Sequence, residues 1–125
     1  MVRWLLVIHP EVWEWLQEIR KTDRLTAALI GQAIQHVIDG RGPDEGRPLV
    51  DRIKGSQLHH LKELRPASTG ETEVRILFIF DPARQMVLLV AGDKSRNWRG
   101  WYEVAIPRAE ARYTEHLAAL NDEDE

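Results

Sequence analysis

The apolar segment Val74–Phe80 constrains the fold of this chain more than any other part of the sequence. It is the most apolar run, and its β-branched and aromatic residues favour a strand at the centre of a sheet. Residues 81–84 follow with the sequence Asp-Pro-Ala-Arg, which is typical of a turn, and Met86–Ala91 form a second apolar run. The two runs therefore predict a β-hairpin with a short loop.

The elements before this hairpin are predicted by the spacing of apolar residues. Residues 3–8 are short, apolar and closely followed by Pro10, which favours a first strand. Apolar residues then recur at helical spacing, which predicts one helix after Pro10 and a second after the capping residues Thr22 and Asp23. Residues 40–57 are rich in glycine and proline and indicate a loop.

The complete pattern predicts an α+β protein. We expect Leu58–Arg65 to form a mixed strand and Pro107 to begin the last helix. The predicted order is β-α-α-β-β-β-α, with an antiparallel-dominated sheet that helices cover on one side. The length of 125 residues fits one domain. We assign it to residues 1–120 and expect residues 121–125 to form an acidic, mobile tail.

Charge is distributed unevenly along the chain. The net charge is −3, yet residues 47–101 carry ten Lys and Arg against six Asp and Glu. Such a basic stretch is typical of a phosphate-binding face, although a solvated surface of mixed charge explains it equally well. The absence of cysteine excludes disulfides and thiolate metal sites. Because no apolar stretch resembles a secretion signal or is long enough to cross a bilayer, we expect a cytoplasmic protein with no membrane partner.

Arg75 interrupts the central apolar run near its start. An arginine at such a position either pairs with a carboxylate, such as Glu63 or Glu73, or projects into a cleft. The ion pair is the more common of the two. On the preceding strand, alternation places Glu63 and Arg65 together on one face. The residues alone leave both roles of Arg75 open.

The segment Gly92–Tyr102 concentrates basic and aromatic residues in a predicted loop. Within nine positions it carries Lys94, Arg96, Trp98, Arg99, Trp101 and Tyr102. This composition suits single-stranded nucleic acid, because cations hold phosphates while aromatic rings stack on bases. The alternative is that Trp98 and Trp101 anchor the last helix to the core while the three cations are merely exposed. For the tryptophans, this alternative is the more common role.

No motif in the sequence indicates a metal or a nucleotide cofactor. The glycines of residues 40–46 match neither of the two common phosphate-binding loops. None of the five histidines forms a His-Glu-x-x-His motif, and the adjacent His59 and His60 would point to opposite faces of a strand. A zinc site would need ligands that are distant in the sequence. We therefore expect neither metal nor cofactor.

Seven short motifs follow one another along most of the chain. They are Arg47-Pro48-Leu49, Ile53-Lys54-Gly55-Ser56, Leu61-Lys62-Glu63-Leu64-Arg65, Val74-Arg75-Ile76-Leu77-Phe78, Phe80-Asp81-Pro82, Leu88-Leu89-x-Ala91-Gly92-Asp93-Lys94 and Ile106-Pro107-x-Ala109. In this order and spacing, the chain resembles the RelE/HigB superfamily of toxins from type II toxin–antitoxin systems, in particular its HigB-like, phage Gp49-like branch. The resemblance implies a RelE-like fold.

The resemblance also implies an activity and partners. Such toxins are endoribonucleases (mRNA interferases) that cleave messenger RNA with little sequence preference, in many members only on the translating ribosome. Each is neutralised by a small antitoxin, usually with a helix-turn-helix, that also represses their shared operon. The implied partners are therefore a helix-turn-helix antitoxin, mRNA and the ribosome, with operator DNA contacted only through the antitoxin.

Candidate site residues follow from the matched motif positions and from the basic, aromatic segment. The candidates for catalysis are Glu63, Arg65, Arg75, Lys94 and Tyr102. The candidates for RNA binding are Lys54, His59, His60, Arg96 and Arg99. Metal-free cleavage needs a base for the 2′-hydroxyl, cations for the phosphorane and an acid for the 5′-oxygen.

Several residues suit each of these three roles. Arg65 and Arg75 suit the cationic role, because a guanidinium holds phosphate oxygens in a bidentate fork. The base is Glu63 or one of the two adjacent histidines, and the acid is Tyr102 or Lys94. The sequence does not choose among them.

Two other functions remain open. ParE-type relatives share the fold but bind DNA gyrase and lack the nuclease residues, whereas this chain keeps Arg65, Arg75 and Lys94. The other possibility is a decayed toxin that survives only as a binding module for its antitoxin.

Overall fold

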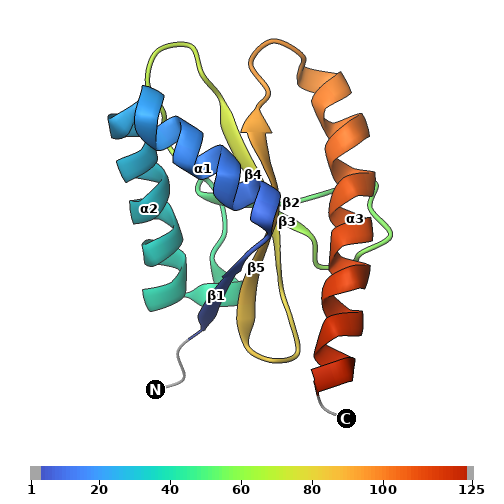
Figure 1. The fold of residues 1–125 in the computed structure, drawn as a ribbon. Coiled ribbons are helices and arrows are strands. Elements are labelled where there is room, and N and C mark those ends of the chain that lie inside the picture. The colour runs from blue at the N-terminus through green and yellow to red at the C-terminus, as the bar shows by residue number, and fades with distance from the viewer. Residues whose placement is uncertain (1–3, 124–125) are drawn as a thin grey trace.

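The predicted hairpin lies at the centre of the sheet in the computed structural model, which describes residues 4–123 (Figure 1). The elements are β1 (Leu5–Ile8), α1 (Pro10–Thr22), α2 (Arg24–Asp39), the short 3₁₀ helix η1 (Gly42–Asp44), β2 (Val50–Arg52), β3 (Lys62–Leu64), β4 (Val74–Phe80), β5 (Gln85–Asp93) and α3 (Trp98–Glu123). The predicted α+β class is confirmed.

The strands form one mixed sheet in the order β1-β5-β4-β3-β2. The pair β1–β5 is parallel and the three other pairs are antiparallel, so the predicted antiparallel dominance is confirmed. The turn between β4 and β5 is held by Asp81, whose carboxylate accepts hydrogen bonds from the backbone N–H groups of Ala83 (3.0 Å) and Gln85 (2.8 Å). These side-chain bonds allow a short Asp-Pro turn to join the two longest strands.

The central hairpin is buried on both faces. Ile76 and Phe78 of β4 pack with α1 and α2, whereas Leu77 and Ile79 pack with α3. Figure 1 shows α1 and α2 on one side of the sheet and α3 on the other, so the expectation that helices cover one side only is wrong. A strand that is apolar at nearly every position has no face to offer to water, and both of its faces therefore need a cover.

The short strands also differ from the sequence-based prediction. The predicted loop 40–57 contains η1 and the edge strand β2, and the predicted strand Leu58–Arg65 is reduced to the three residues of β3. A strand of three residues is too short for a period of two to be recognised in the sequence.

The last helix begins at Trp98 rather than at Pro107. Asn97 starts it, because its side-chain Oδ1 accepts a hydrogen bond from Gly100 N (3.1 Å) and its carbonyl accepts one from Trp101 N (2.9 Å). Asparagine is a strong N-cap residue. Pro107 is exposed inside the helix, where the backbone carbonyl that it leaves without a donor can face water.

The helix α3 continues to Glu123 and so includes residues 121–123 of the predicted tail. Asp124 and Glu125, the rest of the predicted tail, lie outside the described residues. None of the helices within residues 4–123 is long and apolar enough to cross a membrane.

Polar contacts fix α3 against the rest of the fold. Arg112 donates a 2.6 Å hydrogen bond to the carbonyl of Leu89 and pairs with Glu11 of α1. Nearer the end of the helix, His116 Nε2 lies 2.6 Å from the buried Asp81 carboxylate in the β4–β5 turn. The position of α3 over β5 is therefore set at more than one point along its length.

We expect Gly92→Ala to destabilise the protein, because α3 passes close to β5 at this residue. A Cβ at position 92 would lie 2.5 Å from Trp101 Nε1, closer than packed atoms approach one another. Such overpacking typically costs about 1–3 kcal/mol. The free energy of unfolding from urea denaturation measures the effect.

Gly31→Ala is the matched control, because Gly31 lies inside α2 and a Cβ there would meet no atom within 4 Å. Alanine at such a helical position stabilises by about 0.4–1 kcal/mol. A Gly92→Ala protein as stable as the parent would show that the Trp101 ring does not pack on Gly92 as described.

Candidate active site

Glu63 lies at the centre of a group of buried and partly buried polar side chains. Its Oε2 accepts a hydrogen bond of 2.6 Å from the hydroxyl of Tyr102. Its Oε1 lies 4.0 Å from Arg75 Nε and 3.9 Å from Arg65 Nε. Lys94 completes the group, with its Nζ 5.3 Å from the centre of the Tyr102 ring. The five predicted catalytic residues therefore lie together, and we call them the Glu63 cluster.

The strand register explains how these residues meet. Glu63 of β3 lies opposite Leu77 of β4, and Arg75 is two residues before Leu77, so both charged side chains point to the face that α3 covers. Arg75 in turn lies opposite Gly92 of β5. Lys94 is two residues beyond Gly92 and continues the ladder, because its backbone N–H donates to the carbonyl of Glu73.

Arg75 is held near Glu63 without being saturated by hydrogen bonds. Its side chain is only 9% exposed, and its Nη1 donates a 2.8 Å hydrogen bond to the carbonyl of Val74. Within residues 4–123, the buried Nε has no hydrogen-bond acceptor. The ion pair with Glu63 is confirmed, and the Nε, which the fold shields from solvent, is left without a hydrogen bond among the described residues.

Lys94 is buried beneath two aromatic rings. Its side chain places Nζ 3.4 Å from the centre of the Trp98 ring, and the residue is 2% exposed. Burial lowers the pKa of Lys94 and the neighbouring Arg75 lowers it further, whereas Glu63 and Glu73 oppose this shift. An ammonium group with a lowered pKa releases its proton more readily, which suits a general acid.

Tyr102 is a hydrogen-bond donor within the cluster. Burial raises the pKa of Tyr102, and the hydrogen bond to Glu63 and the negative charge of that carboxylate raise it further. The phenol therefore stays protonated at neutral pH. Its hydroxyl orients the Glu63 carboxylate and does not act as a general base.

Two histidines that were candidate bases lie away from the Glu63 cluster. His59 and His60 are exposed and line a depression together with Phe80, at the opposite end of β4 from Arg75. Lys54 is exposed in the connection between β2 and β3. Within residues 4–123, no three His, Asp or Glu side chains are grouped so that they could hold a metal ion.

The two tryptophans of α3 have different environments. Trp101 is partly buried and packs on the core beneath α3, as an anchor does. Trp98 is 56% exposed, so its prediction as a core anchor is wrong. As the first residue of α3, it packs on Lys94 and donates a hydrogen bond of 2.7 Å to Glu73. The exposed cations Arg96 and Arg99 flank it in the sequence.

Sequence reasoning missed one carboxylate of the site and misjudged another. Asp51 of β2 lies 3.9 Å from Arg65 and shares this guanidinium with Glu63. No signal marked Asp51, because β2 itself was not predicted. Glu73 was considered only as a partner of Arg75, whereas it binds the indole N–H of Trp98.

The family model described as phage-derived protein Gp49-like matches residues 16–114, which include the whole Glu63 cluster. The chain belongs to this family. It is similar to a Mycobacterium tuberculosis protein that carries the toxin name HigB2, with 47% identity over 108 residues, 86% of this chain and 52% of that protein. It is also similar to a protein of the same organism that carries the toxin name HigB3, with 42% identity over 114 residues, 91% of this chain and 94% of that protein.

The Gp49-like chain thus spans about half the length of the first relative and nearly all of the second. These comparisons confirm the resemblance to the HigB-like, Gp49-like branch that the sequence motifs indicated. No solved structure matches the chain.

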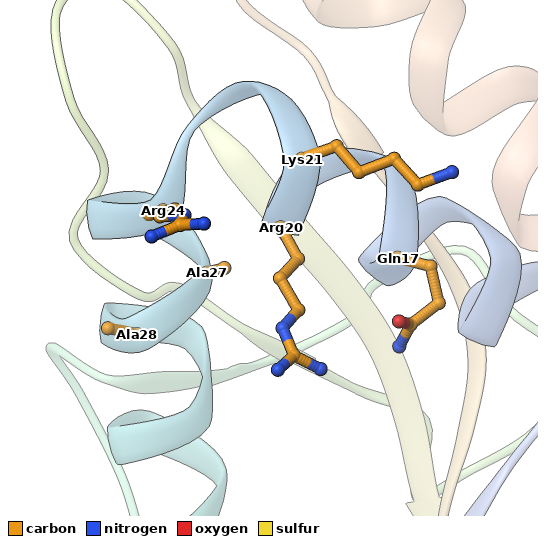
Figure 2. Close-up of a pocket in the computed structure, with 6 residues that line it drawn as sticks. All are labelled: Gln17, Arg20, Lys21, Arg24, Ala27 and Ala28. Carbon is orange, nitrogen blue, oxygen red and sulfur yellow. The ribbon is translucent and has the colours of Figure 1, made fainter.

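The Gp49-like chain also has a basic depression of about 820 Å³ at the connection between α1 and α2. Gln17, Arg20 and Lys21 extend from α1 and Arg24 from α2 (Figure 2). Because the two helices cover the opposite face of the sheet from α3, this depression is separate from the Glu63 cluster. Its lining offers three cations and an amide.

We expect Glu63→Gln to lower the pKa of Lys94 and Arg75→Met to raise it. The carboxylate of Glu63 stabilises the neighbouring ammonium, whereas the guanidinium of Arg75 repels it. An NMR titration of the Lys94 side-chain carbon Cε, assigned by its loss in Lys94→Arg, measures both shifts. Shifts of the same sign in the two variants would show that Lys94 does not lie between these charges.

Proposed function

We propose that this Gp49-like protein is the toxin of a type II toxin–antitoxin pair, a cytoplasmic endoribonuclease that cleaves mRNA on the translating ribosome. The observation that carries the proposal is the Glu63 carboxylate, which Tyr102 holds by a 2.6 Å hydrogen bond and whose Oε1 lies 4.0 Å from Arg75 Nε, so that a base and a cation stand side by side. Arg65 and Lys94 add positive charge beside it. The toxin names of the two mycobacterial relatives support the same function.

The proposed reaction uses the RNA's own 2′-hydroxyl as the nucleophile. Its oxygen forms a bond to the adjacent phosphorus while the bond from phosphorus to the 5′-oxygen breaks, which leaves a 2′,3′-cyclic phosphate and a 5′-hydroxyl. One proton leaves the 2′-oxygen and another is added to the 5′-oxygen. The protein therefore needs a base, an acid and cations for the negative charge that develops on the phosphorane.

The geometry of the Glu63 cluster suits these roles. Arg75 and Arg65 bind the non-bridging phosphate oxygens. Oε1 of Glu63 lies beyond hydrogen-bond distance from both guanidinium groups and is free to accept the 2′-hydroxyl proton, while Tyr102 holds Oε2 in place. Lys94, whose pKa burial lowers, protonates the 5′-oxygen.

The proposed antitoxin is a small helix-turn-helix protein that neutralises or covers this cationic site. Arg65, Arg75 and Lys94 present positive charge that acidic antitoxin side chains would complement, and such complementarity speeds association. Operator DNA is contacted only through the antitoxin in this proposal.

We expect the chain expressed alone to arrest bacterial growth and shorten cellular mRNA, and Arg75→Ala to relieve both effects. Removal of one donor that stabilises a transition-state oxyanion costs about 10²–10³ in rate. Growth after induction and mRNA ends mapped by primer extension measure the two effects. The matched control is Arg41→Ala, which removes an exposed arginine between α2 and η1 and keeps the Glu63 cluster intact.

The outcomes separate the possible functions. An Arg75→Ala protein that unfolds at the parent's temperature and is as toxic as the parent would show that Arg75 has no part in the activity and that the site is misplaced. Growth arrest with intact mRNA would indicate a toxin that is not a nuclease, such as a gyrase-binding one. Normal growth with the parent would indicate a module that only binds its antitoxin.

A further inference from the structure

Trp98 is a large aromatic side chain that the protein leaves exposed beside the Glu63 cluster. It is 56% exposed and is not among the side chains that pack on either core. It lies one helical turn before Tyr102 on α3, and residues four apart share a helix face. Its ring is therefore on the side of α3 that faces the cluster. Core packing does not account for a tryptophan at this position.

The orientation of the Trp98 ring is fixed by two contacts. The indole N–H donates a 2.7 Å hydrogen bond to Glu73, and the ammonium group of Lys94 packs on the ring at 3.4 Å from its centre. A cation over an aromatic face is an attractive contact. A fixed ring loses little conformational entropy when a flat ligand stacks on it.

We propose that Trp98 is a stacking platform for one unpaired nucleobase of the RNA strand bound at the Glu63 cluster. The inference rests on the proposed function, and it adds a binding site for the base to a site for the phosphate. Stacking is tolerant of sequence because every base has a π-face. The exposed cations Arg96 and Arg99 on either side of Trp98 are available for the neighbouring phosphates.

Stacking on Trp98 adds recognition of a nucleobase to the binding of the phosphate. Arg75 and Arg65 hold a phosphate, which is the same at every nucleotide, whereas Trp98 requires a base that is unstacked from its neighbours. Single-stranded RNA and a ribosome-bound codon satisfy this requirement, and an RNA duplex does not. Trp98 thus selects unpaired RNA without reading its sequence.

Binding of two uncleavable oligonucleotides tests this proposal. The first is a seven-nucleotide single-stranded RNA with 2′-O-methyl groups, and the second is a strand of the same length and charge that lacks all bases. The variants are Trp98→Leu, which removes the ring, and Trp98→Phe, which keeps a ring but not the hydrogen bond to Glu73. Trp13→Leu is the matched control, because Trp13 is 52% exposed on α1, across the sheet.

We expect Trp98→Leu to weaken binding of the base-containing strand by about 5- to 150-fold, which corresponds to roughly 1–3 kcal/mol for one stacked base. Trp98→Phe should retain most of the affinity, Trp13→Leu all of it, and the strand without bases should not distinguish the variants. Fluorescence polarisation of end-labelled strands measures these affinities.

Equal weakening of both strands in Trp98→Leu would overturn the proposal, because Trp98 would then act only through Lys94 or the fold. Unchanged affinity of Trp98→Leu for the base-containing strand would overturn it while the proposed nuclease function stands. A parent protein that binds neither strand would also overturn the platform, whereas the proposed ribosome-dependent nuclease is tested separately by growth arrest and mRNA ends.

Discussion

The site depends on the carboxylate of Glu63, because its contacts join three elements of the fold. It comes from β3, accepts a hydrogen bond from the hydroxyl of Tyr102 on α3, and lies 4.0 Å from the guanidinium of Arg75 on β4. Arg65, Arg75 and Lys94 would repel one another at this spacing without a negative charge between them. Glu63 thus allows positive charge to be gathered in a buried place before any substrate arrives.

Such an arrangement is useful for catalysis because it needs no reorganisation when charge develops on the substrate. Arg75 lies on β4, and Arg65 and Lys94 directly follow β3 and β5, so the sheet that is buried on both faces holds these donors in place. The Trp101 ring of α3 packs on Gly92 of β5, while Tyr102 and Trp98 of the same helix contact Glu63 and Lys94. The position of one helix therefore sets both the hydroxyl that orients Glu63 and the proposed platform for a nucleobase.

Much of this arrangement could be predicted from the sequence, and the parts that could not have physical reasons. The apolar run Val74–Phe80 predicted the central hairpin. The same run has no polar face, which already indicated that helices cover both sides of the sheet, but the prediction did not use this. Alternation correctly placed Glu63 on one face of its strand, whereas β2 is too short to leave a pattern. Pro107 misplaced the start of α3, because it is a strong start signal and the capping role of Asn97 is visible only in its hydrogen bonds.

The exposed state of Trp98 could not be predicted, since a tryptophan is usually packed on a core. Its environment depends on where α3 begins relative to the end of β5, which sequence spacing does not give.

The nature of the cleaved RNA ends tests most directly whether the Glu63 cluster acts through the ribose 2′-hydroxyl. The main cut site is first mapped on a short message translated in vitro with the purified protein, and the nucleotide before the cut is then replaced by its 2′-deoxy form. We expect the unmodified message to yield a 2′,3′-cyclic phosphate, detected by mass spectrometry, and the 2′-deoxy message to remain intact at that site. Equal cleavage of both messages would contradict the role assigned to Glu63 and its neighbouring cations.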